Sequence, residues 1–492
     1  MSLRRVLGVV GLMEIFFGIA MAAPLAVSLI YRDGDALAFL GAMVLTIAAG
    51  GALSRLARGD SEITTREGFA IVTLGWTGAA AFGALPYLFT GTAGGFWRAL
   101  FESMSGLTTT GATIFSDIEA LPRGILFWRS LTHWIGGMGI IVLAIAVLPY
   151  LGVGGMQLFR AEVPGPTPER LRPRIAQTAK LLWLVYLGMT LAQSLLYRLG
   201  GLDWFDAITH TFATLATGGF STRNDSLAAF PSPFVQYVTI LFMYLAGINF
   251  ALHFRALTGR LEYFRDQEWR FLTGIILGSG LVLAGVNLVG GAHPLTTGGV
   301  EEAVRTGLFQ STSITTTTGF VSADYEAWLP AGQVILLALM FVGGMAGSTG
   351  GGIKAVRVLL LLKHGWLEVR KHLHPRAIFL TRVGRQTVGE GVMANIIGFV
   401  LLYLLLLLAG ILVLGFMGMD LLTALGASAA TVGNIGPGWG AVGATDHYGW
   451  MEAPALAVLT FLMLVGRLEI YTVLLLLLPE TWRRRRPRSV RT

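Results

Sequence analysis

Four short polar stretches with glycine and hydroxyl side chains recur along this 492-residue chain. They are LTTTGAT (107–113), LATGGFST (215–222), TTTTGFVS (315–322) and ATVGNIGPG (430–438). Main-chain carbonyl and threonine hydroxyl oxygens can replace the water shell of a small cation. Glycine permits positive φ angles and lets backbone segments approach closely. One such stretch is a weak signal, but four of them predict a cation site assembled from four segments.

The stretches align on one glycine each: Gly111, Gly218, Gly319 and Gly433. These glycines are 107, 101 and 114 residues apart, and so regular a period predicts one unit repeated four times. Each unit reads as an apolar span, a short helix, a glycine turn and a second span. The short helices are predicted over 97–107, 203–215, 300–314 and 419–430, and none is long enough to cross a bilayer.

Acidic residues lie at or near the starts of three of these short helices, where they meet the positive end of the helix dipole. They are Asp203, Asp206, Glu301, Glu302 and Asp420. Capped surface helices would explain them but would leave the threonine-rich stretches without a role. We therefore expect each short helix to dip into a membrane and end near mid-depth, because non-helical backbone at that depth must be buried in protein or line a water-filled path.

Composition supports a membrane protein, since 54% of residues are hydrophobic and only 13% are charged, against about 25% charged in soluble proteins. Ten spans are predicted: 6–30, 36–54, 68–90, 124–150, 180–200, 234–257, 271–290, 331–362, 391–417 and 453–479. The first span contains Glu14 and is too long for a signal peptide, so we expect it to be retained. The absence of cysteine excludes disulfides, thiolate metal sites and cysteine nucleophiles. Without HExxH, GxSxG or Walker motifs, a membrane enzyme is not expected.

Most of the 36 Lys and Arg residues fall in alternate connections between spans. The positive-inside rule then predicts that both termini are cytoplasmic. The tail Arg483–Arg486 is interpreted as a topology anchor near anionic lipid, with partner docking as the alternative. This placement explains the net charge of +8 without nucleic acid.

With these residues in view, the sequence resembles the Trk/Ktr/HKT superfamily of potassium transporters, and most of all its TrkH type. Thr431-Val432-Gly433 resembles the start of potassium-channel filters, and 136–166 resembles the stretch between that type's first two repeats. The resemblance implies an all-α polytopic membrane protein with four tandem span–pore helix–span repeats around a central pore. The expected divisions are an N-terminal two-helix hairpin (1–66), repeats at 67–165, 166–262 and 263–378, and a fourth repeat with the basic tail (379–492).

The resemblance also implies a filter that binds K⁺ at equivalent positions of the four repeats. The expected filter residues are Thr109, Thr110, Gly111, Ala216, Thr217, Gly218, Thr317, Thr318, Gly319, Thr431, Val432, Gly433 and Asn434. Sodium-permeable plant members have serine where this chain has Gly111, which implies a preference for potassium. A sodium-permeable or proton- or sodium-coupled transporter of the same fold stays open as an alternative. An inverted-repeat carrier is disfavoured because successive repeats enter the membrane from the same side.

The predicted span 331–362 is interrupted by GGMAGSTGGGIK (343–354). Each glycine costs a helix about 1 kcal/mol relative to alanine, so the helix should break here. Close packing of helices would need only spaced glycines such as Gly343 and Gly347. In the resembled family this segment is the intramembrane loop that obstructs the pore. The expected gate residues are Gly347, Gly350, Gly351, Gly352, Lys354 and Arg467.

Arg467 stands in the middle of the last span, where a charge is costly and faces a cavity or a partner. Two interpretations stay open, a buried ion pair with another helix and a positive charge beside the ion path. At about 6 Å and an effective dielectric of about 20, the second would repel a passing cation by roughly 3 kcal/mol. Lys354 is considered as a partner for a carboxylate in the closed state. His133, His210 and Asn249 are expected to form structural hydrogen bonds.

The resemblance further implies partners that the residues themselves do not show. These are a second copy of the chain in a homodimer and a separate cytosolic nucleotide-binding regulatory subunit of the TrkA kind. The expected location is the bacterial cytoplasmic (inner) membrane.

Overall fold

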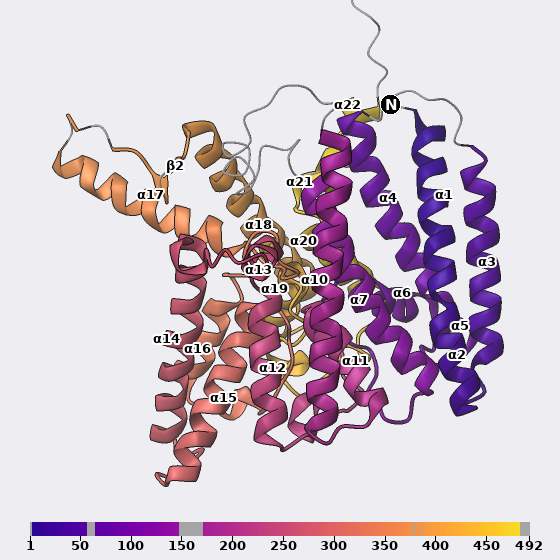
Figure 1. Cartoon of the computed structure of the whole chain (residues 1–492), viewed down its shortest axis with the longest axis horizontal. Helices are drawn as coiled ribbons and strands as arrows, with labels where there is room; N and C mark the ends of the chain where they lie inside the picture. Colours follow the sequence, from indigo (N-terminus) through magenta and orange to yellow (C-terminus); the bar gives the residue numbers. More distant parts are fainter. Residues whose placement is uncertain are drawn as a thin grey trace, which may run out of the picture.

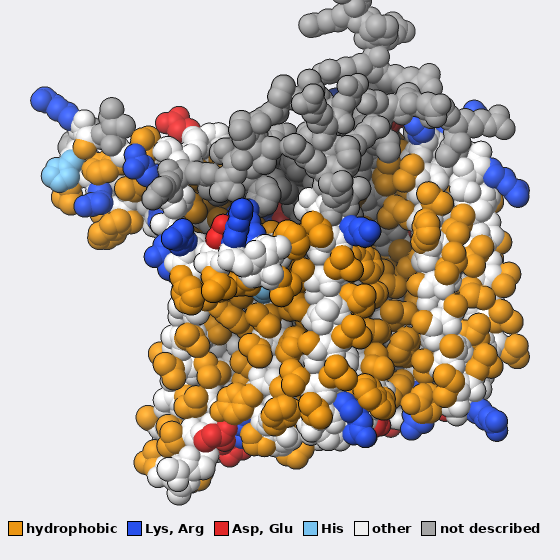
Figure 2. All heavy atoms as spheres, viewed as in Figure 1, with side chains coloured by type: hydrophobic (Ala, Val, Ile, Leu, Met, Phe, Trp, Pro, Cys, Tyr) orange, Lys and Arg blue, Asp and Glu red, His pale blue; other side chains and the backbone are white. Residues whose placement is uncertain are grey.

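The computed structural model of the chain describes residues 2–56, 64–146, 171–374, 376–377, 379–384 and 386–482. The regular structure in these residues is almost entirely helical, and the strands among them form one hairpin, β1 (Arg382–Val383) with β2 (Gln386–Thr387). Six helical segments are long and apolar enough to cross a membrane, or eight if each of two bent pairs counts as one span. Figure 2 shows a broad band of hydrophobic side chains across the body, with charged side chains gathered towards its two ends. This band is the surface expected of a protein that lies in a bilayer.

The first spans pack through glycine. They are α1 (Leu3–Ala20), α2 (Ala22–Tyr31), α3 (Ala36–Ser54), α4 (Thr65–Gly83) and α5 (Leu85–Phe89). A Cβ built on Gly11 of α1 would lie 2.6 Å from the carbonyl oxygen of Gly50 in α3, and the reverse holds at Gly50. Small residues at such a crossing let two membrane helices approach to backbone contact. The two spans of the N-terminal hairpin are therefore fixed to each other by tight helix packing.

The remaining helices follow in four similar groups. The first has α6 (Phe96–Leu107) and α7 (Arg123–Ala146); the second has α10 (Leu171–Leu199), α11 (Trp204–Leu215), η2 (Ser226–Ala229), α12 (Pro233–Ala246) and α13 (Phe250–Leu257). The third has η3 (Tyr263–Arg265), α14 (Gln267–Val289), α15 (Thr297–Thr315), η4 (Tyr325–Ala327), α16 (Pro330–Leu339) and α17 (Ala355–Leu373). The fourth has α18 (Glu390–Phe416), α19 (Leu421–Gly433), η5 (Gly440–Val442), α20 (Ala453–Arg467), α21 (Tyr471–Leu477) and α22 (Pro479–Trp482).

The four short helices α6, α11, α15 and α19 confirm the predicted short segments. Each packs against one helix that precedes it and one that follows it in the chain: α6 with α4 and α7, α11 with α10 and α12, α15 with α14 and α16, α19 with α18 and α20. Contacts also run to the neighbouring group, since α6 meets α20, α11 meets α7, and α15 meets α12. The contact of α6 with α20 brings the last group against the first, so the groups close around a centre.

Side chains at the helix starts fix where the short helices begin. Asp203 accepts from the amide of Asp206, and Asp420 accepts from the amides of Leu422 and Thr423. The predicted acidic caps are thus confirmed for α11 and α19. In α15 the cap is Thr296, while Glu301 lies inside the helix and pairs with Arg305 at 2.9 Å.

Three of the predicted second spans are broken rather than straight. α12 and α13 meet at 101°, and α20 and α21 meet at 118°. Between α16 and α17, residues 340–354 form no helix, which confirms the predicted interruption. Figure 1 shows α17 extending sideways from the bundle, and it places the N-terminus and α22 at the same end of the molecule. Within the described part of the chain, the break after α16 therefore redirects the third group out of the bundle.

Some sequence predictions fall outside the described residues. These include 147–166 of the segment that resembles the inter-repeat stretch, and the basic tail Arg483–Arg486. The divisions of the chain into repeats stay predictions.

Candidate ion pathway

Each short helix ends in the same backbone turn. The residues Thr109, Thr217, Thr317 and Asn434 have φ angles of 49°, 53°, 61° and 53°. In every case the amide of the next residue donates to the carbonyl five positions earlier, at 2.8–2.9 Å (Thr110 to Ser105, Gly218 to Ala213, Thr318 to Ser313, Ile435 to Ala430). This is the Schellman arrangement that closes helix ends, usually with glycine or asparagine in the left-handed position. Threonine is β-branched and rarely adopts positive φ, so three of the four turns are strained.

Two residues after each left-handed position comes a glycine, also with positive φ. These ring glycines are Gly111, Gly219, Gly319 and Gly436, with φ of 83°, 79°, 77° and 101°. Since the preceding turn has the same hydrogen bonds in all four segments, these glycines are structurally equivalent. A larger residue would be strained at any of them.

The ring glycines contact one another's segments in a closed cycle. A Cβ built on Gly111 would overlap the carbonyl oxygen of Gly218, and one built on Gly219 would overlap that of Thr318. A Cβ on Gly319 would overlap the carbonyl oxygen of Ile435, and one on Gly436 would lie 2.6 Å from that of Thr110. Each carbonyl involved belongs to the residue that precedes a ring glycine. The four segments therefore form one ring in which only glycine fits at the joints.

The predicted alignment is wrong in two of the four repeats. Gly218 stands one residue before its ring glycine, and Gly433 stands three residues before. Gly433 is the last residue of α19, and the Thr431 hydroxyl bonds to the Ala427 carbonyl at 2.7 Å as in a helix. The resemblance of Thr431-Val432-Gly433 to a channel filter thus falls on a helix end.

The other expected filter residues stand at or beside the ring. Thr109, Thr110, Gly111, Thr217, Gly218, Thr317, Thr318, Gly319 and Asn434 lie at the left-handed, carbonyl and glycine positions, and Ala216 ends α11 just before them. Gly219, Ile435 and Gly436 were missed. For Ile435 and Gly436 a signal was present in the sequence. Asn434-Ile435-Gly436 matches the Thr-Thr-Gly of the first and third repeats, because asparagine tolerates the left-handed conformation of the first position.

The intramembrane loop, residues 340–354, lies against the C-terminal ends of three short helices. The Thr349 hydroxyl donates to the carbonyl of Leu215, the last residue of α11, at 2.9 Å. The Gly351 amide donates to the Thr317 hydroxyl at 2.6 Å. A Cβ on Gly351 would lie 2.6 Å from the Gly433 carbonyl oxygen at the end of α19. The loop therefore fits against these helix ends because Gly350 and Gly351 have no side chains to accommodate where it approaches them.

Arg467 holds this loop from the last span. Its side chain is buried, and one of its terminal nitrogens donates to the Thr349 carbonyl at 2.8 Å. Its other two nitrogens have no hydrogen-bond partner in the described part of the chain. The buried ion pairs found among the described residues do not include Arg467, and the nearby carboxylate Glu469 pairs with Arg357 instead. The described residues thus give no ion-pair partner for Arg467, and the interpretation as a positive charge beside the ion path stays a prediction. Lys354 bonds to the Gly350 carbonyl within the loop rather than to a carboxylate.

Comparisons with known proteins agree with this architecture. A family model described as a TrkH cation transport protein matches residues 36–483. The potassium uptake protein TrkH of Halomonas elongata is 41% identical over 98% of this chain and 100% of its own length. That of Escherichia coli K12 is 42% identical with the same coverage. The chain belongs to the TrkH family.

The fold is also similar to the crystal structure of the potassium transporter TrkH from Vibrio parahaemolyticus. It matches with a TM-score of 0.90 at 39% identity, covering 98% of this chain and 100% of the other. The resemblance and the fold class inferred from sequence are confirmed, and the chain is a multi-pass membrane transport protein rather than an enzyme.

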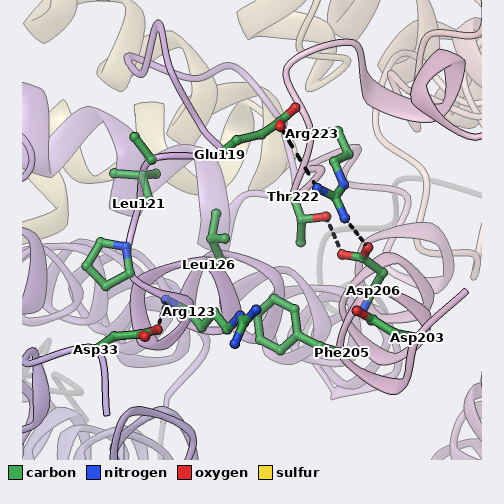
Figure 3. Close-up of a pocket in the computed structure, with 12 residues that line it drawn as sticks. Asp33, Glu119, Leu121, Arg123, Leu126, Asp203, Phe205, Asp206, Thr222 and Arg223 are labelled. Atoms are coloured by element: carbon green, nitrogen blue, oxygen red, sulfur yellow. Dashed lines mark hydrogen bonds and ion pairs between the residues drawn. The ribbon is translucent and has the colours of Figure 1, made fainter. Parts of the chain in front are cut away.

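A charged cavity of about 370 Å³ opens where the N-terminal hairpin of this TrkH protein meets the first two groups. Its lining includes four carboxylates and two guanidinium groups: Asp33, Glu119, Asp203, Asp206, Arg123 and Arg223. Arg223 lies between Asp206, at 2.7 Å, and Glu119, at 3.9 Å (Figure 3). The excess of negative charge favours cations at this face.

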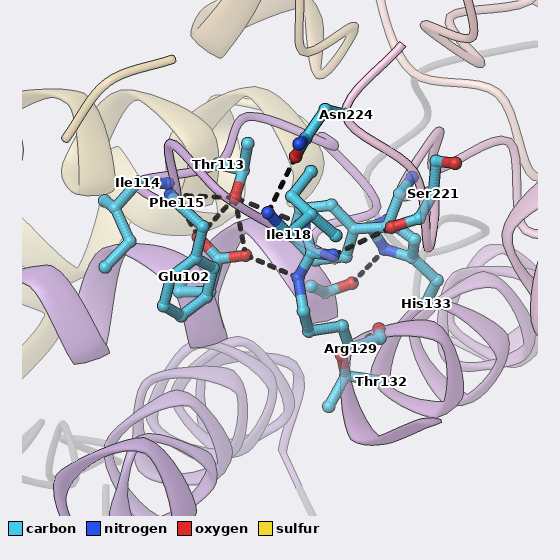
Figure 4. Close-up of polar contacts among 12 residues, drawn as sticks. Glu102, Thr113, Ile114, Phe115, Ile118, Arg129, Thr132, His133, Ser221 and Asn224 are labelled. Carbon is cyan, nitrogen blue, oxygen red and sulfur yellow. Dashed lines mark hydrogen bonds and ion pairs between the residues drawn. The ribbon is translucent and has the colours of Figure 1, made fainter. Parts of the chain in front are cut away.

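A buried ion pair, Arg129 with Glu102, bonds to the first two segments of the ring (Figure 4). Arg129 of α7 donates to Glu102 of α6 at 2.8 Å, and both side chains are almost completely buried. Arg129 also donates to the Ser221 carbonyl at 2.9 Å, and Glu102 accepts from the Ile114 amide at 2.9 Å. The pair thus touches the backbone of both segments. Sequence reasoning missed it because its partners lie in different helices.

His133 also connects the first and second segments, and its hydrogen bonds require one protonated and one unprotonated ring nitrogen. Its Nε2 accepts from the Phe220 amide at 3.2 Å, so its Nδ1 carries the proton and donates to the Gly106 carbonyl at 2.7 Å. The expected structural roles of His133 and His210 are confirmed, since His210 bonds to Ser221 at 2.9 Å. Asn249 instead caps α13 through the Ala251 amide.

The other joints are tied in similar ways. The Glu326 carboxylate accepts from the Gly440 amide at 2.8 Å, and burial raises the pKa of Glu326. Between the fourth and first segments, the Tyr448 amide donates to the Thr113 carbonyl at 2.8 Å. The side-chain nitrogen Nδ2 of Asn434 donates to the Thr110 hydroxyl at 3.0 Å. Between the second and third segments, the Val321 amide donates to the Ser226 hydroxyl at 3.2 Å, so every joint of the ring has bonds outside it.

Proposed function

We propose that this chain takes up potassium across the bacterial cytoplasmic membrane through the ring of four segments. The observation that carries the proposal is the closed cycle of glycine-to-carbonyl contacts at Gly111, Gly219, Gly319 and Gly436. Such a ring presents main-chain oxygens to a dehydrated cation. The relatives of this chain are named potassium uptake proteins, which supports K⁺ as the transported ion rather than a bound cofactor.

The filter we propose has three positions in each repeat. It comprises Thr109, Thr110 and Gly111; Thr217, Gly218 and Gly219; Thr317, Thr318 and Gly319; and Asn434, Ile435 and Gly436. The short helices end at this ring, so their negative dipole ends point towards a cation held there. Ala216, Thr431, Val432 and Gly433 then support the filter from the helix ends.

The gate we propose is the intramembrane loop with its attachments. Gly347, Gly350, Gly351 and Gly352 allow it to lie under the ring, while Arg467 holds it through Thr349. Lys354 stabilises the loop internally. Flux requires the loop to move away from the ends of α11, α15 and α19.

Topology and partners complete the proposal. The N-terminus and α22 lie at one end of the molecule, which we assign to the cytoplasm. We also propose a homodimer and a cytosolic nucleotide-binding regulatory subunit of the TrkA kind, which would act on the loop from that side.

Ion-replacement flux in liposomes tests this function. Purified protein should pass K⁺ much faster than Na⁺, and an imposed proton gradient should leave the reversal potential at the value set by K⁺. Equal passage of both cations would overturn the potassium filter. A reversal potential that follows the proton gradient would favour coupled transport instead.

A further inference from the structure

Glu268 is a buried carboxylate bonded to two main-chain amides on opposite sides of the intramembrane loop's glycine run. It stands in the first turn of α14 and is 8% exposed. Its Oε1 accepts from the Ala346 amide at 2.8 Å and from the Val356 amide at 3.1 Å. Ala346 lies before the run and Val356 lies after it, in the first turn of α17. One oxygen atom therefore joins the entry and the exit of the loop.

The bond to Val356 takes the place of a helix cap. The residue before α17, Lys354, makes no side-chain cap and has a φ of 81°. The first amides of a helix have no partner within the helix, so an acceptor from another segment takes that place here. Glu268 thus stabilises the start of α17 and the loop together.

A second contact joins α17 to the start of α14, which is itself held by a helix cap. Lys363 of α17 donates to Gln267 at 2.6 Å, and Asp266 caps α14 through the Trp269 amide at 2.9 Å. On its other side the loop is bonded to the second group and to the ring. The Thr349 hydroxyl donates to the carbonyls of Leu215 and Ala246, the Met345 amide donates to the Gly247 carbonyl at 2.9 Å, and the Gly351 amide donates to the Thr317 hydroxyl. Glu268 adds to these the contact that joins both ends of the loop to α14. We propose that Glu268 is the positioning residue that keeps the intramembrane loop in its closed place under the ring. This inference rests on the proposed function only in taking that loop to be the gate.

A single introduced thiol can report the position of the loop, because the chain has no cysteine. Ser348 is 3% exposed, so Ser348→Cys places a protected thiol in the loop. In this background, Glu268→Ala should raise the rate of modification by a water-soluble methanethiosulfonate at least tenfold. Glu268→Gln should raise it less than threefold, because the amide oxygen can still accept both bonds. Glu262→Ala is the matched control, since Glu262 pairs with Arg255 at the surface, and it should leave the rate unchanged.

Potassium flux measured on the same samples separates this inference from the proposed gate. Faster modification with faster flux supports both. Faster modification with unchanged flux keeps Glu268 as the positioning residue and overturns the loop as the gate. Unchanged modification overturns the role of Glu268, whatever the flux. If Glu268→Ala does not fold, Glu268→Asp decides in the same way, because its shorter side chain cannot reach both amides.

Discussion

Replacing Gly436 by alanine tests the ring at its fourth joint. A Cβ at this position would lie 2.6 Å from the Thr110 carbonyl oxygen. Carbon–oxygen contacts in proteins are about 3.3 Å or longer, so the carbonyl would have to move by roughly 0.7 Å. The φ of 101° adds backbone strain that alanine tolerates poorly, on the order of 1–2 kcal/mol.

The displacement is large enough to change ion binding. Groups of a binding site must stay within about 0.5 Å of their working positions. We therefore expect the preference for K⁺ over Na⁺ to fall about tenfold, which corresponds to about 1.4 kcal/mol. The measurement is the ratio of K⁺ to Na⁺ flux in liposomes, with folding checked by gel filtration.

Gly433→Ala is the control within the same segment. Gly433 is helical, and a Cβ built on it would lie 2.9 Å from a side-chain atom of Ile435 and 3.3 Å from one of Tyr403. Because these side chains can rotate, we expect the flux ratio to stay within about twofold. A loss of preference in Gly433→Ala with a normal ratio in Gly436→Ala would refute the register found here and restore the alignment predicted from sequence.

Three further changes test other parts of the structure. Arg467→Ala should increase K⁺ flux, because it removes a buried charge and the bond to Thr349; equal or lower flux in folded protein would count against its place in the gate. Glu102→Gln should lower stability by about 3–5 kcal/mol, since it leaves Arg129 as an unpaired buried charge, and thermal unfolding measures this. An unchanged unfolding temperature would show that the ion pair does not clamp the ring. Glu14→Met should raise the unfolding temperature, because both carboxylate oxygens of Glu14 are buried without a partner in the described part of the chain and each such group costs about 1–3 kcal/mol. A lower temperature would mean that Glu14 makes a stabilising contact.

The sequence was enough to predict the membrane class, the fourfold repeat and the break in the third group. These features depend on composition and local pattern, which a single chain displays directly. Apolar runs of about 20 residues predict spans, and a run such as Gly350–Gly352 predicts a broken helix wherever it falls.

Tertiary structure alone decided the register of the ring and the residues that hold it. The stretch ATVGNIGPG offers three glycines, and only backbone angles and contacts between repeats select Gly436 over Gly433. The partners of Arg129, Arg357 and Glu268 come from other segments of the chain, so no local spacing indicates them. A membrane interior makes such pairings obligatory, because a buried charge or amide without a partner is costly there, but which partner is used depends on how the helices pack.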